Sequence, residues 1–65
     1  MRQWLINIRK SKGLSQYKVA REANISQSYY AEIEGGYRGN PLNVNIAKSI
    51  AKVLDFDWTL FYEEN

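Results

Sequence analysis

The segment NISQSYYAEIEGG, residues 24–36, has two chemically different faces if it is helical. A helix turns by about 100° per residue, so Gln27, Ser28 and Glu32 gather on one face around the small Ala31. Tyr30 and Ile33 gather on the other, which is the expected core face. A glutamine amide places a donor beside an acceptor, which matches N6 and N7 of adenine. Serine bonds to more than one base, and glutamate can accept from cytosine N4. This face predicts contacts with base edges, although a solvated helix end can have the same composition.

A second short helix is expected directly upstream, over residues 16–23. Ser15 and Ser26 are of the type favoured at helix N-caps, and Asn24 tolerates the positive φ of a tight turn. Two short helices joined in this way form a helix-turn-helix, whose second helix enters the major groove of DNA. Gln16 stands at a helix N-terminus, where backbone N–H groups favour an anion. It therefore predicts a phosphate contact.

The rest of the chain is predicted to be helical as well. Apolar steps of three and four residues, with Gly and Pro as breakers, indicate an all-α fold. We expect one domain over 1–65, with five short helices at 2–13, 16–23, 27–34, 44–54 and 58–64. Asn43 and Asp57 are candidate caps of the last two. No β-alternation and no repeat is present in the sequence.

Composition excludes several classes of function. The 65 residues include no histidine and no cysteine, so the commonest general base and the commonest metal ligands are missing. There is also no glycine-rich phosphate loop, and we expect neither an enzyme nor a metal or cofactor. No apolar run approaches the roughly 20 residues of a membrane span. We therefore expect a cytoplasmic protein with no membrane partner.

Charge is distributed unevenly. Residues 1–38 hold seven Lys and Arg against three Glu, whereas residues 39–65 hold two Lys against four acidic residues. A basic front half suits a polyanionic partner, although part of any such excess is ordinary solvated surface.

The segment GLSQYKVAREANISQSYYAEIEGGYRGNP resembles the helix-turn-helix of the Cro and lambda/434 repressor type. The similarity extends over nearly the whole chain, because LSQ, ISQS, IE-G and the later IAKVLDFDW stand at the family's spacing. It implies a lambda-repressor-like DNA-binding domain with the helix-turn-helix in helices 2 and 3. It also implies a structural ion pair between Arg9 and Glu34.

The same resemblance assigns contacts with double-stranded DNA. The residues expected to face bases are Gln27, Ser28 and Glu32. Those expected to approach the DNA backbone are Gln16, Tyr29, Gly35, Tyr37, Arg38 and Asn40. Tyr29 and Tyr37 suit either packing or hydroxyl donation to phosphate, and tyrosines can also stack on single-stranded bases.

Two departures from the family pattern bear on these roles. Residues 41–50 form a segment one residue longer than usual, which shifts the register of the loop contacts. Glu32 also places a negative charge where many relatives have a neutral residue. Near phosphates this charge needs a partner, such as a cytosine amino group or a neighbouring lysine. Without such a partner, Glu32 is expected to disfavour binding to sites that have other bases at that position.

The C-terminal aromatic residues predict a subunit interface. Nine aromatic residues are present, and three of them lie in the last eight positions. A surface patch of this kind often marks an interface, and in the resembling family this region commonly joins two subunits. The expected interface residues are Phe56, Trp58, Phe61 and Tyr62. The alternative for Trp58, Phe61 and Tyr62 is an ordinary place in the core.

These observations favour a sequence-specific transcriptional regulator. We expect a homodimer that represses by occupying a palindromic operator. The alternative is an antitoxin-like interaction module that binds a partner protein as well as its own promoter. An antagonist or toxin partner therefore stays open, and steep salt dependence of binding would favour the DNA-binding hypothesis.

Overall fold

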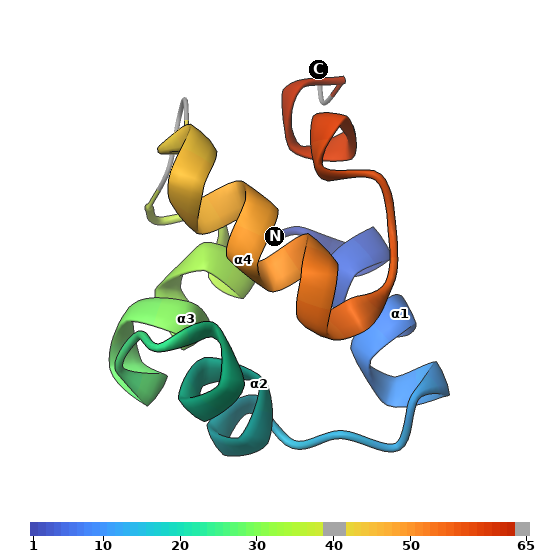
Figure 1. Cartoon of the computed structure of the whole chain (residues 1–65), viewed down its shortest axis with the longest axis vertical. Coiled ribbons are helices and arrows are strands. Elements are labelled where there is room, and N and C mark those ends of the chain that lie inside the picture. The colour runs from blue at the N-terminus through green and yellow to red at the C-terminus, as the bar shows by residue number, and fades with distance from the viewer. Residues whose placement is uncertain (39–41, 64–65) are drawn as a thin grey trace.

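The computed structural model describes residues 1–38 and 42–63 and shows an all-α arrangement. It contains four α-helices and one 3-10 helix within these residues (Figure 1). Their bounds are α1 Gln3–Ser11, α2 Gln16–Ala23, α3 Gln27–Gly35, α4 Val44–Leu54 and η1 Trp58–Tyr62. In Figure 1 the α2–α3 pair lies at the lower left, and η1 lies at the top.

The starts of the described helices other than α1 are determined locally by side-chain caps. The Ser15 hydroxyl accepts from the Lys18 N–H at 3.1 Å, and Asn43 Oδ1 accepts from the Asn45 N–H at 2.8 Å. Asp57 Oδ1 accepts from the Thr59 N–H at 3.0 Å. Each cap satisfies a backbone donor that has no partner inside its helix. The caps predicted from the sequence at these positions are therefore confirmed.

One buried cluster draws on all five helices. Its fully enclosed large side chains are Leu5, Val19, Tyr30, Ile33, Ile50 and Leu54. Helix α2 packs against α3 and α4, α4 also packs against η1, and α1 packs against α3. The recognition helix candidate, α3, is therefore fixed from two sides by α1 and α2.

The fifth predicted helix is present as a short 3-10 helix. It covers residues Trp58–Tyr62, and such tighter helices are typical of short pieces. Phe61 is only 4% exposed and belongs to the core. Its burial fixes η1 against the rest of the chain. Phe61 therefore exposes little surface of its own, and its expected place at a subunit interface stays a prediction.

Candidate nucleic-acid interface

The turn between α2 and α3 has the expected helix-turn-helix geometry. Asn24 ends α2 in the left-handed region at φ 62°, a conformation that asparagine tolerates better than most residues. The Ile25 N–H donates back to the Ala20 carbonyl at 2.9 Å. The Ser26 hydroxyl then accepts from the Tyr29 N–H at 3.0 Å and starts α3. Three residues thus redirect the chain and leave the first turn of α3 at the surface.

Helix α3 has the two faces expected from its sequence. Tyr30 and Ile33 are fully buried. Gln27 and Ser28 are exposed in the first turn, and Glu32 is half-buried one turn further along. The exposed row carries amide, hydroxyl and carboxylate groups on a rigid, packed helix. Such a row can present donors and acceptors to the edges of base pairs.

The far end of α3 is held by Arg2, a contact that sequence reasoning missed. The Arg2 side chain is buried, and its Nη1 donates to the carbonyl of Ile33 at 2.7 Å and to that of Arg38 at 2.9 Å. Its guanidinium carbon also lies 5.6 Å from the centre of the Phe61 ring. In the sequence Arg2 resembles any basic surface residue, and no local signal indicates these carbonyls 31 and 36 residues away.

The expected pair of Arg9 and Glu34 is present and has a further member. Arg9 Nε lies 2.6 Å from Glu34 Oε2, and Gln16 Nε2 donates to Glu34 Oε1 at 2.9 Å. These contacts tie the end of α1 and the start of α2 to the end of α3. Burial raises the pKa of the Glu34 carboxyl, but the hydrogen bonds from Arg9 and Gln16 outweigh it and lower the pKa below its ordinary value.

Gln16 therefore has a structural role in addition to its expected phosphate contact. The bond to Glu34 uses one N–H of its amide, and an amide has a second N–H and a carbonyl oxygen. Its position at the start of α2 matches the predicted place for a phosphate, beside N–H groups of the first helical turn. The bond to Glu34 fixes the direction of the side chain before any ligand arrives.

Tyr30 adds a buried phenol next to this group. Its hydroxyl has no hydrogen-bond partner among the described residues. Burial, followed by the neighbouring Glu34 carboxylate, raises the pKa of Tyr30 far above its ordinary value. The phenol is therefore neutral at physiological pH, and the sequence-based assignment of Tyr30 to the core is confirmed.

Glu32 is paired within the chain rather than left free. Its Oε1 accepts from Arg38 Nε at 2.6 Å, and both side chains are roughly half exposed. The Arg38 guanidinium carbon lies 5.5 Å from the centre of the Tyr29 ring. A base-contact candidate, a backbone-contact candidate and a tyrosine thus form one surface cluster. The sequence analysis expected a cytosine amino group or a neighbouring lysine as the partner of Glu32, whereas the partner within the chain is an arginine.

The other expected backbone-contact residues lie close to this cluster. The Tyr37 side chain is 85% exposed, and the Tyr37 N–H closes the end of α3 by donating to the Glu32 carbonyl at 2.9 Å. A Cβ at Gly35 would lie 2.7 Å from the Tyr37 ring, so glycine permits the ring to fold over the end of the helix. Asn40 lies outside the described residues.

The C-terminal aromatic residues divide into an inner and an outer group. Trp4, Phe56 and Phe61 pack against one another with ring centres 5.1 to 5.7 Å apart. Trp58 and Tyr62 form a separate edge-on pair with centres 5.8 Å apart, and the Tyr62 hydroxyl donates to the Leu42 carbonyl. Of the four expected interface residues, Phe56 and Phe61 therefore belong to the inner group, and Trp58 and Tyr62 to the outer one.

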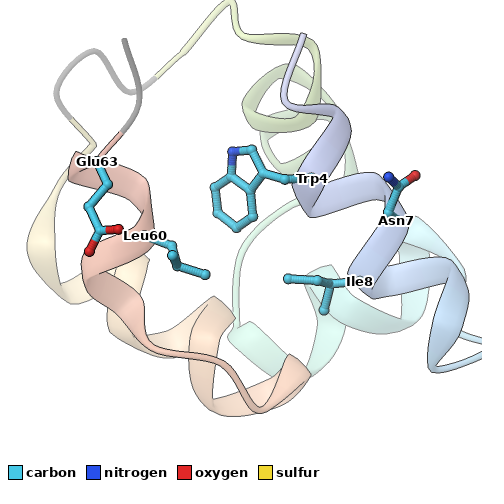
Figure 2. Close-up of a pocket in the computed structure, with 5 residues that line it drawn as sticks. All are labelled: Trp4, Asn7, Ile8, Leu60 and Glu63. Atoms are coloured by element: carbon cyan, nitrogen blue, oxygen red, sulfur yellow. The ribbon is translucent and has the colours of Figure 1, made fainter.

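A mostly apolar cavity of about 490 Å³ lies between α1 and η1. Figure 2 shows Trp4 and Ile8 of α1 directed toward Leu60 of η1, with Asn7 and Glu63 at the edges. Among the described residues that line it, Glu63 is the only one with an acidic or basic side chain, so they offer no pair of groups suited to acid–base chemistry.

Two kinds of site are not found in the part of the chain that is described. No group of three or more acidic residues could hold a metal ion within residues 1–38 and 42–63. The longest helix among these residues, α4, has 11 residues, and none is long and apolar enough to cross a membrane.

The comparisons with known proteins agree with this geometry. Residues 5–61 match the helix-turn-helix family. The chain is 45% identical over 64 residues to the uncharacterized HTH-type transcriptional regulator YqaF of Bacillus subtilis, covering 98% of this chain and 82% of that protein. No solved structure matches significantly. With α2 and α3 forming the motif and the polar row of α3 exposed, the chain belongs to the Cro/C1-type helix-turn-helix family of DNA-binding, non-enzymatic transcriptional regulators.

Proposed function

We propose that the protein is a repressor that binds a palindromic operator as a homodimer, with α3 in the major groove. The observation that carries this proposal is the exposure of Gln27 and Ser28 in the first turn of a helix whose opposite face is fully buried. In helix-turn-helix proteins the N-terminal residues of the second helix meet the base edges. Gln27 suits adenine, and Ser28 can bond to more than one base.

The backbone contacts would flank this base-reading row. Gln16 at the start of α2 would meet one phosphate. Arg38 and Tyr37 beyond the end of α3 would meet another. Gly35 ends α3 beside Tyr37, and Tyr29, in the first turn of α3, contacts the Arg38 guanidinium. Such contacts fix the position of the helix on the duplex and carry no sequence information themselves. Asn40 is assigned to the same group from the resemblance alone.

The second subunit would contact η1 through the outer aromatic pair. Trp58 is partly exposed and Tyr62 is 39% exposed, and aromatic side chains are enriched at interfaces. Phe56 and Phe61 would support this surface from below. Two-fold symmetry would place the two α3 helices about one DNA turn apart, roughly 34 Å. Repression would then follow from occupying a promoter.

A selection from random duplexes tests this proposal. Wild-type protein should enrich a short palindromic motif, and Gln27→Ala and Ser28→Ala should weaken or relax the preference at defined positions. Gln3→Ala is the matched control, because Gln3 is an exposed glutamine at the start of α1 that bonds only to Asn7 among the described residues. An enriched motif that is identical in all variants would show that α3 does not read the bases. Absence of any motif would refute sequence-specific binding.

A further inference from the structure

Glu32 and Arg38 oppose each other chemically on the proposed DNA-facing surface. Arg38 is a cation placed to neutralise a phosphate, whereas Glu32 is an anion on the helix that would enter a groove lined by phosphates. In the free protein they form a 2.6 Å ion pair. The pair contributes little positive charge to the surface, because each charge cancels the other.

Arg38 is also held in place by contacts other than Glu32. Its guanidinium lies over the Tyr29 ring, and its carbonyl accepts from the buried Arg2 side chain. The position of the residue at the end of α3 is therefore determined by the fold. Whether the Arg38 guanidinium is available to another anion, however, depends on Glu32.

The ion pair can be exchanged at small cost. Exposed ion pairs contribute little net stability, since solvent screens both charges. If a phosphate takes Arg38, the Glu32 carboxylate loses its partner. The exchange is favourable only where a donor on a base edge replaces the guanidinium, and cytosine N4 is a base donor of the major groove suited to a carboxylate.

We propose that Glu32 determines specificity by restraining Arg38, so that Arg38 binds phosphate fully only where the site offers Glu32 an amino group. This inference rests on the proposed function and deepens it. On an arbitrary duplex the pair stays closed, and Arg38 neutralises no phosphate. At a site with a suitably placed cytosine, Arg38 exchanges Glu32 for a phosphate while Glu32 exchanges Arg38 for the cytosine amino group. Glu32 thus lowers affinity for non-specific DNA more than affinity for the operator.

The salt dependence of binding measures this exchange. Each neutralised phosphate adds about −0.9 to the slope of log K against log salt. Glu32→Gln should therefore steepen the slope on a scrambled duplex by about 0.9. Between 50 and 200 mM salt that change corresponds to about a 3.5-fold greater loss of affinity. The ratio of operator to scrambled affinity should fall.

A mutant cycle separates this effect from a general change in charge. In an Arg38→Gln background there is no arginine to release, so adding Glu32→Gln should leave the slope unchanged. The matched control is Glu22→Gln, which also removes one negative charge from a half-exposed pair, Lys18–Glu22 at 3.0 Å on α2. It should change the slope much less than Glu32→Gln.

The experiment uses the whole chain, fluorescence anisotropy, and two duplexes of equal length and composition, one selected and one scrambled. A slope on the scrambled duplex that does not differ between wild type and Glu32→Gln would overturn the inference. An equal change in the Arg38→Gln background would overturn it as well. Both of these outcomes are measured on the scrambled duplex, so they do not depend on whether the protein is a sequence-specific repressor. The proposed function is refuted by a different result, namely equal affinity of the wild-type protein for the selected and the scrambled duplex.

Discussion

Removing Glu34 should destabilise the protein more than removing any exposed acidic residue. The Glu34 side chain is 3% exposed and that of Arg9 is 11% exposed, with 2.6 Å between Nε and Oε2. Breaking a buried ion pair by deleting one partner typically costs about 3–5 kcal/mol, because the other charge stays buried without compensation. Arg9 keeps its bond to the Leu14 carbonyl, which places Glu34→Ala near the lower end of that range.

This loss is large for so small a chain. At about 0.05–0.15 kcal/mol per residue, 65 residues give a total stability of only about 3–10 kcal/mol. Urea unfolding followed by tryptophan fluorescence can measure the change, since Trp4 lies in the inner aromatic group. Glu22→Ala is the control, because its pair with Lys18 is half exposed and such pairs contribute about 0–1 kcal/mol.

A double variant tests the physical reason directly. Arg9→Met combined with Glu34→Leu removes both charges and keeps apolar volume in the site. Replacing both members of a buried pair in this way is often neutral or stabilising, so the double variant should be more stable than Glu34→Ala. The reasoning fails if Glu34→Ala costs no more than Glu22→Ala, or if the double variant is the least stable of the three.

Three further predictions concern pH, packing and capping. The pKa of Glu34 is lowered in the folded state. The contribution of the Glu34 carboxylate to stability should therefore be complete above the ordinary pKa of 4.5 and be lost as pH falls through the folded pKa. The difference in free energy of unfolding between wild type and Glu34→Gln, measured by urea titration at each pH, should narrow only in that acid range. Phe61→Ala should cost about 3–5 kcal/mol in thermal or urea unfolding because it empties a core position. Trp58→Ala should cost less stability and should instead weaken self-association, measured by sedimentation. Equal stability losses in the two variants would contradict the division into inner and outer aromatic groups. Ser26→Ala should cost about 1 kcal/mol by removing the α3 cap, and retention of full stability would show that the hydroxyl bond to the Tyr29 N–H contributes little.

Much of the fold could be predicted from the sequence because its signals are local. Ser15, Asn43 and Asp57 begin helices through bonds to N–H groups two or three residues ahead, and Asn24 ends α2 through its own backbone preference. The apolar periodicity also assigned Tyr30 to the core. The final helix was predicted without its type, and the structure shows that it is a 3-10 helix whose Phe61 is buried in the core.

The candidate site also has one part that could be predicted from the sequence and one that could not. Gln27, Ser28 and Glu32 share a face because of helical periodicity, which can be recognised in the sequence alone. The burial of Arg2, the bond from Gln16 to Glu34 and the choice of Arg38 as the partner of Glu32 were decided only by the tertiary structure. The Arg2 and Gln16 bonds join residues 18 or more positions apart. The Glu32–Arg38 bond spans six positions across the end of α3. Such distances depend on how helices pack and chains turn, and no local pattern specifies them.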